Sequence, residues 1–112
     1  WVKGKSNDTF GPIGPYLVTK DEIPDINNLN LSLDVNGKRM QTGNSKTMIF
    51  NVNFIVSYLS KFMSLQAGDI ITTGTPPGVG MGMKPQVFLK EGDKIRLSID
   101  NLGEQNSKVV PE

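Results

Sequence analysis

The chain of 112 residues has the length of one ordinary domain, and its composition of 37 % apolar and 21 % charged residues is suited to a hydrophobic core and too mixed for disorder. A formal net charge of +1 gives no bias towards nucleic acid or anionic membranes, and no apolar run is long enough for a membrane-spanning helix. Cysteine and histidine are both absent, which excludes disulfides, Cys/His zinc sites, thiol nucleophiles and Ser-His pairs, and the lack of cysteine fits a cytoplasmic location.

The first half of the chain is predicted to contain a short strand followed by a hairpin. YLVT (16–19) is apolar and β-branched, which favours a strand. Apolar and polar residues then alternate in LSLDV (31–35), and Asn36-Gly37 follows directly. Because both of these residues accept positive φ, the pair is typical of a two-residue hairpin turn. We therefore expect a β-hairpin over residues 31–43.

One amphipathic helix is predicted in the middle of the chain, over about residues 51–65. Its apolar residues recur at steps of three and four, as on one helical face: Met48, Val52, Ile55, Leu59 and Phe62. Asn51 or Asn53 can cap its start, and Ala67-Gly68 ends it. This apolar stripe predicts a helix that packs on a sheet.

The second half of the chain is predicted to return to β-structure. DIITTG (69–74) is expected to form a strand, and a glycine-rich loop (72–84) overlaps its end. Residues 86–100 have β character, with Ile95, Leu97 and Ile99 alternating with polar residues, and a turn and a terminal strand follow. The predicted fold is mixed, mainly β with one main α-helix, and not an alternating βαβ arrangement.

The glycine loop, TTGTPPGVGMGMK (72–84), is the first candidate site. Its G-x-G-x-G spacing is not followed by a helix, and no Gly-Lys-Ser/Thr closes it, so neither a dinucleotide nor a phosphate-binding loop fits. The backbone N–H groups of Gly74 and Thr75, with the Thr75 hydroxyl, could cradle a carboxylate or enolate oxygen. A wide surface turn is the alternative that the residues leave open.

A second candidate lies near the start of the chain, in a stretch that Pro12 and Pro15 stiffen. Lys5 could bind an acid group or stabilise an enolate there, with Asp8 and Thr9 close by in sequence; a solvated loop lysine is the alternative. No convincing metal triad is predicted from the acidic residues, since none forms a Glu-x-Glu pair on a strand: Asp21, Glu22, Asp25, Glu91, Asp93 and Asp100. Lys38-Arg39 is expected to be a solvated charged turn.

Several long motifs together resemble the fumarylacetoacetate hydrolase family. They are KGKSNDTFGPIGPYLVTKDEI, VNGKRMQTGNSKTMIF, YLSKFMSL, GDIITTGTPPGVGMGMKP and GDKIRLSIDNLG, which cover nearly the whole chain. The loop GTPPGVGMGMKP is most similar to members that act as diketo-deoxy sugar acid hydrolases or ureidoglycolate lyases. The resemblance implies a β-roll, usually in a homodimer, and Mg²⁺ or Mn²⁺ bound to a 2-oxo or 2,4-dioxo acid. The near-neutral charge predicts no nucleic-acid or membrane partner.

The resemblance also implies roles for individual residues. Lys5 matches the lysine that lies beside the metal and substrate, and Thr9 matches the threonine of the same motif. Thr75 matches the threonine that contacts the substrate, with Gly74 and Pro76 as its neighbours in the binding edge. Lys5 and Thr75 are thus expected to face one pocket and to act in catalysis.

One departure from the family pattern is large. The metal-binding Glu-x-Glu pair and the Asp that precedes the lysine motif are absent, and the chain starts at Trp1, not at Met. We therefore expect residues 1–112 to be the C-terminal portion of a catalytic domain, inactive alone, with the metal ligands upstream. The expected activity is metal-dependent C–C hydrolysis of a 2,4-dioxo acid. Ureidoglycolate lyase, hydroxymuconate-type isomerase and an inactive structural fragment are the alternatives.

Overall fold

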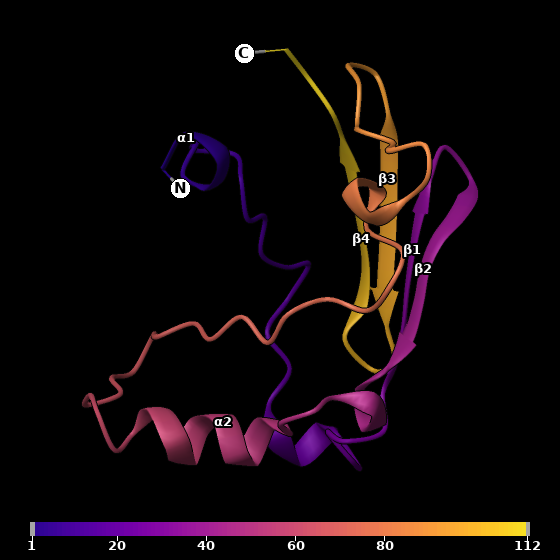
Figure 1. Ribbon diagram of the computed structural model, residues 1–112. Coiled ribbons are helices and arrows are strands. Elements are labelled where there is room, and N and C mark those ends of the chain that lie inside the picture. The colour runs from indigo at the N-terminus through magenta and orange to yellow at the C-terminus, as the bar shows by residue number, and fades with distance from the viewer. Residues whose placement is uncertain (1, 112) are drawn as a thin grey trace.

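The computed structural model describes residues 2–111 and contains one four-stranded antiparallel sheet (Figure 1). Its spatial order is β2-β1-β3-β4, from Asn30–Val35 (β1), Lys38–Asn44 (β2), Lys94–Ile99 (β3) and Gly103–Lys108 (β4). The main helix is α2 (Val52–Leu59), and α1 (Val2–Lys5) is a single turn. Three 3-10 turns complete the elements: Lys20–Glu22, Ser45–Thr47 and Gly80–Gly82. The predicted class, mainly β with one main helix, is confirmed.

The β1–β2 hairpin is confirmed, and its turn is the expected one. Asn36 and Gly37 have φ of 51° and 78°, the positive values of a type I′ turn. The Asn36 side chain also joins the turn to β3, because its amide donates to Asp93 (2.9 Å) and its oxygen accepts from the Lys94 N–H (2.9 Å). The turn therefore aligns β1 with both of its neighbours in the sheet.

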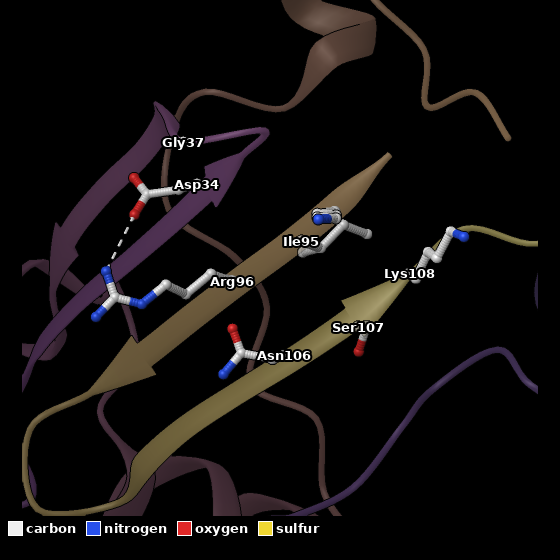
Figure 2. Close-up of a pocket in the computed structure, with 8 residues that line it drawn as sticks. Asp34, Gly37, Ile95, Arg96, Asn106, Ser107 and Lys108 are labelled. Atoms are coloured by element: carbon white, nitrogen blue, oxygen red, sulfur yellow. Dashed lines mark ion pairs between the residues drawn. The ribbon is translucent and has the colours of Figure 1, made fainter. Parts of the chain in front are cut away.

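The two faces of the sheet differ in polarity. The alternating apolar residues of β1 and β3 lie opposite one another in register, as in the pairs Leu33–Leu97 and Val35–Ile95. The intervening pair, Asp34–Arg96, lies on the other face and is an ion pair of 3.9 Å (Figure 2). One face of the sheet is thus available for packing, and the other is polar.

Helix α2 begins where predicted and ends earlier. The Asn51 side chain accepts a hydrogen bond from the Phe54 N–H (2.8 Å), so Asn51 and not Asn53 is the cap. The helix stops at Leu59, six residues before the predicted end, where Phe62 and Met63 bond back to the Leu59 carbonyl. Both of these side chains are exposed, so no burial stabilises a longer helix.

The prediction that α2 packs on the sheet is wrong for this chain. Among residues 2–111, extensive contacts between elements join only the strands, and Figure 1 shows α2 lying away from the sheet. Phe50, just before the helix, forms an exposed row with two aromatic residues of α2 instead, with ring centroids 4.9 Å apart for Phe50–Phe54 and 5.9 Å for Phe54–Tyr58. Between 48 % and 56 % of each residue of this aromatic row is exposed.

Three of the predicted strand segments are absent or shorter than predicted. Residues 16–19 and 69–74 belong to no ladder, and the strand predicted over 86–100 begins only at Lys94, whereas the terminal strand is confirmed as β4. A strand requires a hydrogen-bonded neighbour, and the described chain offers none to these segments. The segment before residue 16 is held by β4 instead: the Gln105 amide donates to the Pro12 and Gly14 carbonyls, each at 3.3 Å.

The chain leaves an unusually large surface uncovered. Its accessible area is 9312 Å², whereas a folded monomer of 12.3 kDa exposes about 6,100 Å². The radius of gyration is 15.5 Å, against about 13 Å for a compact domain of this length. Leu29 is the only buried large apolar side chain in the described residues, and Leu17 and Ile49 are more than nine-tenths exposed. The core that the composition predicts is therefore not assembled within this chain alone.

No helix within residues 2–111 combines the length and the hydropathy that crossing a bilayer requires.

Candidate functional site

Thr75 lies at the centre of the best-defined polar arrangement, where the glycine loop meets β2. Its Oγ1 accepts a hydrogen bond of 2.7 Å from Gln41 Nε2, and the same nitrogen donates to the Pro76 carbonyl at 2.6 Å. Gly74, just before it, has φ of 92°, a value that favours glycine. The three residues predicted for the binding edge, Gly74, Thr75 and Pro76, thus adjoin one buried amide.

Two glycines allow the loop to approach β2 this closely. A Cβ at Gly43 would lie 2.6 Å from the Pro76 Cβ, and a Cβ at Gly78 would overlap the Met40 carbonyl oxygen. Met40 is the extra residue of a β-bulge, because Leu33 pairs with Gln41 while Asp34 pairs with Arg39. The bulge and the two glycines together hold the loop against the strand.

A small apolar cavity of about 190 Å³ lies under the docked loop. Leu33, Val35 and Ile95 of the sheet line one side, and Val79 and Phe88 of the loop region line the other. Gln41 also lines this cavity, so its amide lies at the boundary between apolar packing and the Thr75 edge. Two later glycines of the loop, Gly78 and Gly80, also line this cavity, where each packs closely against backbone.

Lys5 and Thr9 lie elsewhere in the described chain. Lys5 ends α1, Thr9 lies in the following turn, and both are exposed. Figure 1 shows α1 standing apart from the sheet, and within residues 2–111 no hydrogen bond or ion pair connects Lys5 or Thr9 with Thr75. That Lys5 and Thr75 face one pocket remains a prediction.

The acidic residues do not fit a divalent-metal centre. In residues 2–111, no three acidic side chains gather at one place. Most are already bound locally: Asp25 accepts from the Asn27 N–H, Asp69 from the Gln66 N–H, and Asp100 from the Asn30 N–H. Each of these bonds closes a turn or joins two elements, which is a structural use of a carboxylate. That this stretch supplies no metal triad stays a prediction.

A shallow depression of about 460 Å³ on the polar face of the sheet contains none of the predicted site residues (Figure 2). Asp34 pairs with Arg96 there, and also with Arg39, which is therefore more than the solvated turn residue expected. Glu104 accepts hydrogen bonds from Arg96 and Asn106, which lower the pKa of Glu104 to about 2. The ion pairs of Arg96 with Asp34 and with Glu104 thus join β1, β3 and β4 across this face of the sheet.

Gln41 is the residue of this site that sequence reasoning missed. In the sequence it is one residue of the returning strand of a hairpin, within the motif VNGKRMQTGNSKTMIF, and the resemblance assigns it no role. Its partners lie 34 and 35 positions later, in a loop whose docking depends on a bulge. The only feature that points to a role for Gln41 is that its amide faces inward, and this orientation is known only once the strand register is known.

A match to a known family identifies the family of this chain. The profile described as "Fumarylacetoacetate (FAA) hydrolase C-terminal" matches residues 1–110. The chain belongs to the fumarylacetoacetate hydrolase family. Among curated proteins, the "Putative hydrolase" of Burkholderia ambifaria (strain AMMD) is 64 % identical over 106 residues, which cover 94 % of this chain and 38 % of that protein. The chain thus spans less than half the length of the curated relatives it matches.

Solved structures of the fumarylacetoacetate hydrolase family have the same fold. A fumarylacetoacetate hydrolase from Exiguobacterium antarcticum is 44 % identical with a TM-score of 0.94, covering 98 % of this chain and 39 % of that one. A maleylpyruvate hydrolase from Sphingobium sp. SYK-6, in complex with manganese(II) and pyruvate, is 37 % identical with a TM-score of 0.80, covering 88 % and 35 %. A 2-hydroxyhepta-2,4-diene-1,7-dioate isomerase from Mycobacterium marinum is 37 % identical with a TM-score of 0.84, covering 98 % and 40 %.

Proposed function

We propose that this chain forms part of a metal-dependent hydrolase that cleaves a C–C bond in a 2,4-dioxo acid. The observation that carries the proposal is the Gly74-Thr75-Pro76 edge, where a positive-φ glycine and a hydrogen-bonded hydroxyl adjoin a buried amide. Backbone N–H groups and a hydroxyl held in this way suit a carboxylate or enolate oxygen. Two of the similar structures are named as hydrolases of acids of this kind, which supports the reaction class.

In the proposed reaction, water adds to the distal carbonyl carbon, C4, and the C3–C4 bond breaks. The electron pair of that bond forms the enolate of the 2-oxo acid, which takes up a proton at C3. The products are a carboxylic acid and a 2-oxo acid. Thr75 would donate to an oxygen of the substrate acid or enolate, and the Lys5 ammonium would balance the negative charge.

The metal in this proposal, Mg²⁺ or Mn²⁺, takes its carboxylate ligands from protein outside this chain. The manganese-bound maleylpyruvate hydrolase supports a metal in the family, and the chain covers only 35 % of that protein. The acidic residues described above do not fit such a centre.

We also propose that the working enzyme is a homodimer in the cytoplasm, without nucleic-acid or membrane partners. The large exposed area and the aromatic row on α2 support a protein partner. The location rests on the cysteine-free composition alone. Sedimentation equilibrium tests the assembly, and a monomer at micromolar concentration would contradict the homodimer.

The function is tested in a chimera in which this chain replaces the segment that it matches in the Burkholderia ambifaria relative. The chimera should release a 2-oxo acid from acylpyruvates with Mg²⁺ or Mn²⁺, whereas residues 1–112 alone should be inactive. Turnover of ureidoglycolate in place of acylpyruvate would favour the lyase alternative. An inactive chimera that folds and dimerises would favour the structural alternative.

Lys5→Ala in the chimera should reduce turnover by at least ~10²-fold if the lysine stabilises charge in the transition state. Lys3→Ala, two residues earlier in the same helical turn, is the matched control and should leave kcat/KM within about 2-fold. Equal kinetics for the two variants would remove Lys5 from the mechanism.

A further inference from the structure

Gln41 is the only buried polar or charged side chain in the described residues, with 9 % of its surface exposed. It lies in β2 directly after the bulged residue Met40. Bulges commonly redirect a neighbouring side chain, and here the amide points to the glycine loop and not to solvent. A buried amide in this position restricts what the groups around it can donate and accept.

The orientation of the Gln41 amide follows from its partners. A backbone carbonyl oxygen can only accept, so the atom 2.6 Å from the Pro76 oxygen must be the NH₂ nitrogen. The flipped amide would place two oxygens against each other. The same nitrogen lies 2.7 Å from Thr75 Oγ1 and has one further hydrogen to donate. Both hydrogens of the amide are therefore used.

This orientation determines the direction of the Thr75 hydroxyl. A hydroxyl has one proton to donate and two lone pairs that accept. Because Gln41 Nε2 offers only donors, Thr75 Oγ1 must accept from it, and the Thr75 proton must point elsewhere. A hydrogen bond received by a hydroxyl also strengthens the one that it donates.

We infer that Gln41 is a positioning residue that holds the Thr75 hydroxyl as an outward hydrogen-bond donor to an anionic oxygen of the ligand. The inference rests on the proposed function, in which that oxygen belongs to the substrate acid or to its enolate. The bond to Pro76 fixes the backbone next to Thr75, so one amide sets both the place and the proton direction of the donor. In this role Gln41 acts through Thr75.

A double-mutant cycle in the chimera tests this inference. Gln41→Met removes the donor at similar size, and Thr75→Val removes the hydroxyl. Each single variant should lower kcat/KM by at least about 10-fold. The loss in the double variant should be clearly smaller than the product of the two single losses, because the amide acts mainly through the hydroxyl. Losses that multiply would overturn the inference.

Gln41→Glu should change the pH dependence of kcat/KM, which a merely structural role of Gln41 would not do. The ionised carboxylate can only accept, so it would draw the Thr75 proton inward and oppose the Pro76 carbonyl. The loss should therefore exceed that of Gln41→Met and shrink as the pH falls, because the protonated acid regains a donor. A pH-independent loss equal to that of Gln41→Met would contradict the inference. If Gln41→Met does not fold, the pH dependence of kcat/KM for Gln41→Glu tests the inference instead.

The matched control is Gln86→Met, since Gln86 also donates to a backbone carbonyl of the glycine loop, Met81 O at 2.9 Å, but is exposed. Its kcat/KM should stay within about 2-fold of the parent.

Calorimetric titration with oxalate separates this inference from the proposed function if the chimera hydrolyses no acylpyruvate. Coupled losses of oxalate affinity in the Gln41 and Thr75 variants would support the inference without the function, whereas unchanged affinity or no oxalate binding would overturn it.

Discussion

Replacing Gly78 by alanine perturbs the contact that holds the glycine loop against β2. Gly78 has φ of 112°, which side chains other than glycine rarely adopt. The added methyl would overlap the Met40 carbonyl oxygen and lie 3.1 Å from Gln41 Cγ. The obstructing atom is backbone within a paired strand, so the loop and not the strand must move.

Backbone strain and displacement of Thr75 determine how much stability and activity Gly78→Ala should lose. A side chain forced into such a region costs about 1–3 kcal/mol, and the overlap adds to that strain. Thr75 lies three residues before Gly78, so it shifts with the loop. Misplacement of a reactive group by about 1 Å costs up to about 10²-fold in rate. We therefore expect Gly78→Ala to lower the stability by roughly 2 kcal/mol and kcat/KM by about 10- to 10²-fold.

The assay is urea unfolding of the chimera together with kcat and KM for an acylpyruvate. Gly82→Ala is the matched control in the same loop, because a Cβ there meets no atom within 4 Å and its φ is not in the positive range. The control should be within about 0.5 kcal/mol of the parent. A Gly78→Ala variant as stable and active as Gly82→Ala would refute the docked loop.

Two further predictions concern stability. Asn51→Ala should destabilise the chimera by about 1 kcal/mol in urea unfolding, because the Phe54 N–H loses its cap, whereas Asn53→Ala should have little effect. The folded-state pKa of Glu104 is about 2, below its ordinary 4.5, so its contribution is present above about pH 4.5 and is lost as the pH falls towards 2. The melting temperature of Glu104→Gln should therefore fall less between pH 4.5 and 2 than that of the parent. Glu91→Gln is the control. If the melting temperatures of the two variants fell in parallel over this range, the result would contradict the Glu104 ion pair.

Local chemistry predicts the elements whose causes lie within a few residues. The Asn36-Gly37 turn needs only two residues that accept positive φ, and the alternation in β1 and β3 sets which face is apolar. The start of α2 likewise needs one side-chain oxygen three residues before the bonded N–H. These features, and the exclusion of nucleotide loops, follow from the order of the residues alone.

Pairing and burial depend on partners that local patterns do not specify. Residues 16–19 and 69–74 have strand-like composition and remain unpaired, because hydrogen-bonded neighbours for them are not among the described residues. The apolar stripe of α2 is correctly periodic, yet it packs against no sheet here. Periodicity predicts that a face can be buried, and the tertiary arrangement decides what buries it.

The sequence by itself determined the family, the hairpin, the helix start and the residues proposed to meet the substrate, because long ordered motifs and turn chemistry are local properties. Only the tertiary structure decided that Gln41 reaches Thr75 across 34 positions. A bulge at Met40 and close approaches at Gly43 and Gly78 bring the loop to the strand. The direction of the Thr75 proton follows from that contact, because a buried amide with two acceptors has only one way to satisfy them.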